Sequence, residues 1–134
     1  MEHETRNREV QRCHSPPATI LVIESYQALC EMLGMILRRR GFHVLTATDP
    51  LVALDLAGRQ GRIDLLLSEV LRTGLSCEEL ATRFLALHPR AAVVFVRNIG
   101  GPADPPIIFE ILQKPFTVRE LLDAVRSALT PRTK

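Results

Sequence analysis

The sequence is poor in aromatic residues and almost lacks lysine. Five Phe, one Tyr and no Trp occur in 134 residues, which argues against a base-stacking surface for single-stranded nucleic acid. The 17 basic residues, of which only two are Lys, nearly balance 15 acidic ones. A net charge of +2 gives no sign of a nucleic-acid-binding domain. No apolar run approaches the roughly 20 residues of a membrane span. We therefore expect neither nucleic acid nor a membrane as partner.

Cysteine is also scarce. Cys13, Cys30 and Cys77 are odd in number, and no C-x-x-C pair or Cys/His metal spacing occurs. This pattern predicts reduced thiols in a cytoplasmic protein. The first residues are polar and of mixed charge, unlike a secretory signal.

The length and the 46% hydrophobic content fit one compact domain. Residues 1–17 carry three acids and three arginines, end in Ser-Pro-Pro and have little to bury. We expect them to form a disordered polar tail, either an inert extension or a docking segment. Residues 18–130 would form the domain and residues 131–134 a C-terminal tail. With no output domain after it, the domain would act alone, unless the chain is part of a longer protein.

Apolar runs and capping signals predict an alternating α/β order. Short apolar runs typical of buried parallel strands lie at 19–23, 42–46, 65–67, 91–96 and 107–112. Helical patterns occupy 26–40, 50–60, 77–88 and 118–129, and three of them start at capping motifs. This order predicts a doubly wound parallel sheet with right-handed crossovers.

The fourth crossover is unusual. About ten residues separate the fourth and fifth strands, and they include two glycines and three prolines. An average helix needs about 11–12 residues without such breakers. We therefore expect this crossover helix to be missing or reduced to a turn.

Charged side chains follow the ends of the expected strands. Glu24 and Ser25 follow the first strand, Glu69 the third, Arg97 the fourth and Lys114 the fifth. In an open α/β sheet, ligands bind beyond the carboxyl ends of the strands. These side chains are therefore expected to meet in one crevice.

The same segments resemble the CheY-like receiver domain of two-component response regulators. The matching stretches include ILVIESY, DLLLSEVLRTGLSCEEL and, most specifically, ILQKPFTVRELLDAV, so that the resemblance covers residues 18–130. It implies a flavodoxin-like fold with strand order 2-1-3-4-5, a cis Lys114-Pro115 bond and a role in phosphorelay signal transduction.

The resemblance also assigns the site, and this sequence departs from the family there. Glu24 and Ser25 stand at the acidic-pocket positions and Glu69 stands in place of the phosphoacceptor Asp. Arg97 and Ile111 occupy the switch positions, while Lys114 and Pro115 keep the invariant pattern. The family pocket combines three carboxylates with one lysine. Here two carboxylates face two cations, so the formal charge rises from −2 to zero and the electrostatic reason to bind Mg2+ is largely lost.

Two interpretations of Glu69 follow. Its carboxylate could mimic a phosphorylated Asp and hold Lys114, although with less charge than a phosphate. Alternatively, Glu69, Arg97 and Lys114 could form a structural relic of a degenerate site. Glu also extends one methylene beyond Asp, and misplacement on this scale can cost about 100-fold in an oriented reaction.

We therefore predict a pseudo-receiver that is no enzyme, holds no metal or cofactor, and acts by phosphorylation-independent protein–protein contact. The alternative is a residual Mg2+-dependent phosphoacceptor, still regulated by a histidine kinase, that uses Glu69 or Asp64. Asp64 begins the third strand and should lie at the wrong end of the sheet. A flavin or nucleotide binder is disfavoured because no Gly-rich loop follows the first strand.

A reduced fourth crossover would leave apolar side chains of the fifth strand uncovered. The candidates are Ile107, Ile108 and Leu112. Uncovered apolar patches mark interfaces. We expect a homodimer or a protein partner at this face.

Overall fold

The computed structural model describes residues 16–71, 74–98 and 109–130. The expected tails and the residues Ile107 and Ile108 therefore lie largely or wholly outside the described residues. The described part contains five strands, β1 (Thr19–Ile23), β2 (His43–Ala47), β3 (Leu65–Glu69), β4 (Ala92–Arg97) and β5 (Glu110–Gln113). Its four helices are α2 (Gln27–Arg39), α3 (Pro50–Arg59), α4 (Cys77–Leu87) and α5 (Val118–Leu129).

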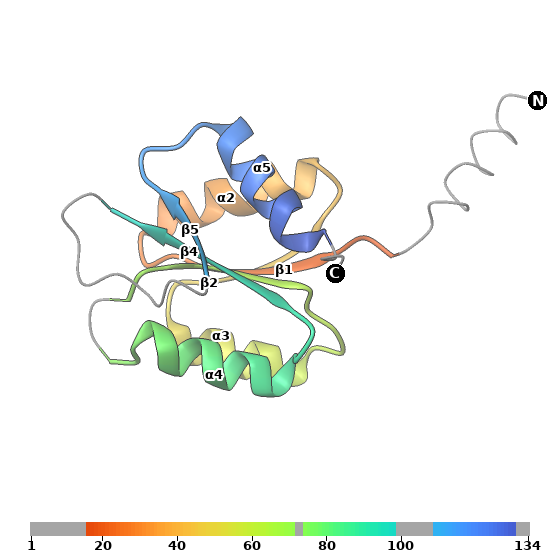
Figure 1. The fold of residues 1–134 in the computed structure, drawn as a ribbon, viewed down its shortest axis with the longest axis vertical. Helices are drawn as coiled ribbons and strands as arrows, with labels where there is room; N and C mark the ends of the chain where they lie inside the picture. Colours follow the sequence, from red (N-terminus) through yellow and green to blue (C-terminus); the bar gives the residue numbers. More distant parts are fainter. Residues whose placement is uncertain (1–15, 72–73, 99–108, 131–134) are drawn as a thin grey trace, which may run out of the picture.

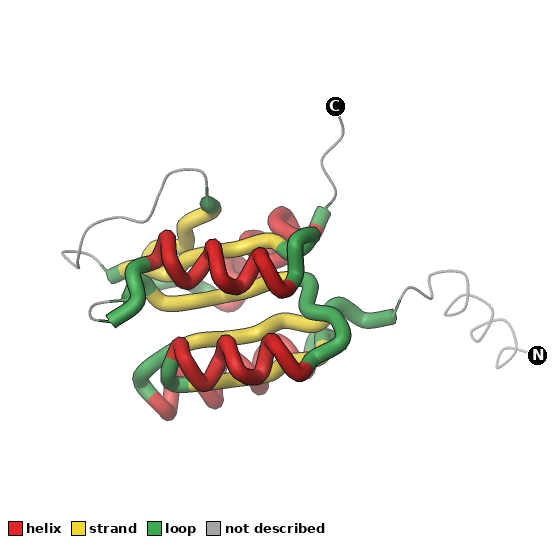
Figure 2. Tube along the Cα trace, turned by 90° about the horizontal axis from the view of Figure 1, so that it is seen from below, coloured by secondary structure: helices red, strands yellow, loops and turns green. Residues whose placement is uncertain are grey.

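The strands form one parallel sheet in the order β2-β1-β3-β4-β5. Helices α2 and α5 cover one face, and α3 and α4 cover the other (Figure 1). Figure 2 shows the sheet between these helical layers from a second direction. The predicted flavodoxin-like fold and its strand order are confirmed. None of the four described helices is long and apolar enough to cross a membrane.

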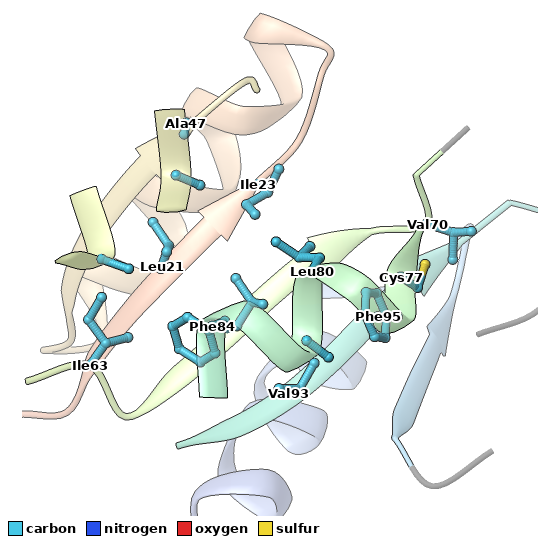
Figure 3. Close-up of a cluster of buried hydrophobic side chains, with 14 residues drawn as sticks. Leu21, Ile23, Ala47, Ile63, Val70, Cys77, Leu80, Phe84, Val93 and Phe95 are labelled. Carbon is cyan, nitrogen blue, oxygen red and sulfur yellow. The ribbon is translucent and has the colours of Figure 1, made fainter. Parts of the chain in front are cut away.

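Two hydrophobic clusters lie on opposite faces of the sheet. The cluster beneath α3 and α4 contains Phe84 and Phe95 (Figure 3). The cluster beneath α2 and α5 contains Leu37 and Leu121. The apolar run of β1 is continuous because the strand lies between the two clusters, and its alternate side chains enter one cluster and then the other.

The helix starts follow the capping signals. The Asp49 carboxylate accepts from the backbone N–H groups of Leu51 and Val52, with Pro50 at the first helical position. The predicted capping boxes at the starts of α4 and α5 are both formed. These caps satisfy backbone donors that the first turn leaves without a helical partner.

Strand β5 differs from its prediction. It spans Glu110–Gln113 rather than 107–112, because its pairing with β4 begins at Glu110 opposite Val94. Leu112 is in register with Val96 and packs against the cluster beneath α2 and α5. This packing contradicts the expectation that Leu112 lacks a cover.

The sequence predicts that the crossover between β4 and β5 has no full helix. The four helices of the described residues fit that prediction. Residues 99–108, on which most of it falls, lie outside the described residues.

Candidate functional site

The site lies at the carboxyl ends of the strands. Glu24 follows β1, Glu69 ends β3, Arg97 ends β4 and Lys114 follows β5. Parallel strands place these ends at one edge of the sheet, as the sequence predicted. Asp64 precedes β3 at the opposite edge, where its carboxylate accepts from the backbone N–H of Thr19 over 2.8 Å. It is therefore remote from the site, as expected.

Glu24 is a buried carboxylate with two donors. It is only 3% exposed. Its Oε1 accepts from Lys114 Nζ over 3.2 Å, and its Oε2 accepts from the backbone N–H of Tyr26 over 3.1 Å. A buried charge needs both a counter-charge and hydrogen bonds to offset the loss of water. Lys114 and Tyr26 supply these to Glu24.

Ser25 donates two hydrogen bonds to the Glu69 carboxylate. The Ser25 hydroxyl donates to Glu69 Oε1 over 3.0 Å, and the Ser25 backbone N–H donates to Oε2 over 3.1 Å. Partial burial raises the pKa of the Glu69 carboxyl, the bond from the Ser25 hydroxyl lowers it, and the neighbouring Glu24 carboxylate raises it. The overall pKa lies above its ordinary value of 4.5. The ionised form of Glu69 thus depends on Ser25.

Lys114 follows β5 and connects β4 to Glu24. Its backbone N–H donates to Arg97 O over 2.9 Å, and the following Lys114-Pro115 bond is cis, as the resemblance implied. Lys114 also lines a cavity of about 500 Å³ with Asn98 and apolar residues of α2 and of the loop after β5. The lysine pairs with Glu24 and not with Glu69. The interpretation in which Glu69 holds Lys114 as a phosphoryl mimic is therefore wrong.

The two switch positions lie on neighbouring strands. The Arg97 guanidinium donates from Nη2 to Gln113 Oε1 over 3.2 Å. This partner was missed at the sequence level, although the strand register that pairs Arg97 with Gln113 is a signal for it. A contact of Arg97 with Glu69 stays a prediction. Ile111 is half-buried and in register with Phe95, on the face of α3 and α4.

Both carboxylates of this pocket have donors within the protein. Mg2+ requires near-octahedral oxygen ligands at about 2.0–2.1 Å and is usually held through one or two carboxylates. Of the two carboxylates here, one is paired with Lys114 and the other is held by Ser25. Among the described residues, no group of three or more His, Cys, Asp or Glu could hold a metal ion. The sequence analysis treated Ser25 only as the loss of one acidic residue. In the structure its hydroxyl and backbone N–H donate to Glu69.

Comparisons with known proteins agree with this fold. No protein-family model matches the chain. The chain is 31% identical to the transcriptional regulatory protein CreB of Escherichia coli over 116 residues, which are 83% of this chain and 50% of CreB. It is 27% identical to the sensory transduction protein RegX3 of Mycobacterium tuberculosis, with the same coverage. The chain thus spans about half the length of these curated relatives.

Solved structures give the same result. The receiver domain of the hybrid histidine kinase CckA is 29% identical, with a TM-score of 0.72 over 84% of this chain and 100% of that one. A response regulator receiver domain protein from Clostridium thermocellum is 26% identical, with a TM-score of 0.74 over 84% of this chain and 94% of that one. The chemotaxis protein CheY4 of Vibrio cholerae, at 22% identity, supports the fold alone.

Proposed function

Because this chain carries a CheY-like receiver domain of the response-regulator family, we propose that it transmits signals by protein–protein contact without accepting a phosphoryl group. The observation that carries this proposal is the pair of hydrogen bonds from Ser25 to both oxygens of Glu69. Hydrogen bonds to both oxygens stabilise the carboxylate charge and fix its orientation, and both effects lower its reactivity as a nucleophile.

The rest of the pocket supports the same conclusion. Phosphoryl transfer depends on a positioned nucleophile and on metal ions or cations that stabilise the transferring oxygens. The Lys114 ammonium is paired with Glu24, and both carboxylates of the pocket have donors within the protein. The Glu69 carboxylate also extends one methylene beyond the Asp of the family. The proposal therefore includes that the domain is no enzyme and uses no metal or cofactor.

The proposed partners are proteins of a signalling pathway. The matched relatives are named as a transcriptional regulatory and a sensory transduction protein, and we place this domain in a comparable regulatory role without contact to nucleic acid or a membrane. A cytoplasmic location is part of the proposal, and the two described cysteines, both free and buried, are consistent with a reducing compartment.

A homodimer through the β5 face is a further part of the proposal. Ile111 points to the face of α3 and α4, and it belongs to neither hydrophobic cluster formed by the described residues. It replaces Leu112 as the candidate contact on this strand. Ile107 and Ile108 keep their place as sequence-based candidates.

Incubation with acetyl phosphate and Mg2+ tests the proposed function. Intact-mass spectrometry reports transfer of a phosphoryl group to the protein with release of acetate. We expect no mass gain for the natural sequence. The control is Ser25→Asp/Glu69→Asp/Arg97→Thr, which restores family-like residue types and is expected to gain one phosphoryl group. Phosphorylation of the natural chain that is lost in Glu69→Gln would establish the residual phosphoacceptor instead and overturn the proposal.

A further inference from the structure

A second cavity lies at the opposite edge of the sheet from Glu69. It has a volume of about 360 Å³ and is formed by the segments 61–64 and 87–91, which lead into β3 and β4. It shares no residue with the site around Glu24 and Glu69. A ligand bound here would leave that site free.

A buried histidine with both ring nitrogens bonded lines this cavity. His88 is 8% exposed. Its Nε2 donates to Ala57 O over 2.9 Å when the ring is neutral, and its Nδ1 then accepts from the Ile63 backbone N–H over 3.3 Å. The ring of Phe84 lies against it, with centroids 5.5 Å apart. His88 joins α3, α4 and the segment before β3, so the cavity is preformed.

Two arginines form the charged part of the cavity. Arg62 has a side chain that is 81% exposed, and its Nε donates to Asp64 Oδ1 over 2.8 Å. This bond satisfies the Asp64 charge and orients Arg62, while its terminal nitrogens remain available for a second acceptor. Arg90 is exposed and makes no ion pair within the described part of the chain. The cavity thus carries more positive than negative charge.

Helix dipoles do not account for these two arginines. Basic residues in the last turn of a helix offset its negative end, but the effect fades within that turn. Arg59 fits this explanation, since it lies in the last turn of α3. Arg62 and Arg90 each lie three residues beyond the last residue of α3 or α4. Their position beside one cavity calls for another explanation.

The remaining wall of the cavity is apolar. Leu87 is 47% exposed at the end of α4, and Pro89 and Ala91 also line the cavity. Guanidinium groups bind carboxylates through paired hydrogen bonds, whereas an apolar wall binds an apolar side chain. A ligand that matches both the arginines and the apolar wall carries acidic groups next to an apolar group.

We propose that this cavity docks a partner-protein segment in which an apolar side chain lies between two acidic ones. The apolar side chain would contact Leu87 and Pro89, and the carboxylates would pair with Arg62 and Arg90. A nucleic acid fits less well because the one aromatic ring that lines the cavity, His88, is buried and has both nitrogens bonded within the protein, and because the chain has a net charge of only +2.

Fluorescence anisotropy with a defined peptide tests this site. The probe is a fluorescein-labelled peptide of alternating Glu and Leu, and a second peptide carries Gln in place of Glu. We expect saturable binding of the Glu peptide, at least tenfold weaker binding by Arg62→Gln/Arg90→Gln, and little binding of the Gln peptide. The matched control is Arg39→Gln/Arg40→Gln, which removes the same charge from the exposed end of α2.

Several outcomes would overturn the proposal. These are no saturable binding, an equal loss of binding in the control variant, and equal binding of the Gln peptide. Tighter binding of an oligothymidylate that depends on Arg62 and Arg90 would indicate a nucleic-acid site instead. Arg90→Gln alone removes no internal bond, so it keeps the test valid if the double variant is unstable. None of these results depends on whether Glu69 accepts a phosphoryl group.

Discussion

Ser25 holds both oxygens of the Glu69 carboxylate, although the two residues lie 44 positions apart in the sequence. An acidic side chain at position 25 would repel Glu69 at this distance. A hydroxyl at this position donates to it instead. Ser25 and Glu69 are both departures from the receiver pattern, and they are complementary. Ser25 removes one acid from the pocket, and it also stabilises the Glu69 carboxylate, which stands in place of the phosphoacceptor.

The Ser25 hydroxyl should control the titration of Glu69. Ser25→Ala removes a bond that lowers the pKa of the Glu69 carboxyl, so this pKa should rise further above its ordinary value. Loss of this exposed hydrogen bond should also cost about 1 kcal/mol of unfolding free energy at neutral pH. NMR titration of the Glu69 side-chain carbonyl measures the first effect and urea denaturation the second. Ser127→Ala, on the exposed side of α5, is the control. An unchanged Glu69 titration would refute the role given to Ser25.

Stability should depend on pH through Glu69. Its pKa is raised in the folded protein, so the folded state binds the proton more tightly than the unfolded state. The contribution of this proton to the free energy of unfolding is fully present below about pH 4.5. It is lost as the pH rises through the folded-state pKa of Glu69. Glu69→Gln abolishes this dependence, keeps an acceptor for Ser25 and should be at least as stable as the natural sequence at pH 7. Urea denaturation between pH 4 and 8 measures it. We expect the difference in unfolding free energy between Glu69→Gln and the natural chain to increase from pH 4 to pH 8. A difference that decreases over this range would contradict the prediction.

The Lys114–Glu24 pair should matter far more than an exposed ion pair. Lys114→Met leaves the Glu24 carboxylate, whose side chain is 4% exposed, without its cation. Breaking a buried pair in this way costs about 3–5 kcal/mol, and Glu24→Gln/Lys114→Met should recover much of that loss. Arg59→Met is the control, because the side chains of the Arg59–Asp55 pair are 77% and 61% exposed and such pairs contribute about 0–1 kcal/mol. Equal losses in Lys114→Met and Arg59→Met would contradict the structural role of this pair.

The proposed homodimer places Ile111 in the contact. Ile111→Lys adds a charge to an apolar contact and should shift the protein to monomers in multi-angle light scattering at micromolar concentrations. Met35→Lys, at an exposed site on α2, should leave the mass unchanged. A natural chain that is monomeric at these concentrations would remove the basis for the homodimer.

Most of the fold could be predicted from local patterns. The continuous apolar run of β1 indicated a strand buried on both faces, and Asp49, Ser76 and Thr117 marked helix starts that the structure confirms. These signals are local and strong, because capping groups and buried runs act within a few residues. Strand β5 was misplaced because its limits depend on pairing with β4 rather than on its own apolar residues.

The partners within the site could not be predicted in the same way. The sequence correctly brought Glu24, Glu69 and Lys114 to one edge of the sheet, because parallel strands end together. It could not decide which carboxylate Lys114 would pair with, since that depends on side-chain reach and on the competing donors of Ser25.

Calorimetric titration with Mg2+ and beryllofluoride, a mimic of the phosphoryl group, tests the central claim most directly. The account predicts no saturable binding, because Ser25 occupies the oxygens of Glu69 and Lys114 is paired with Glu24. Saturable binding that is lost in Glu69→Ala would contradict it and show that the pocket still works as a phosphoryl acceptor site.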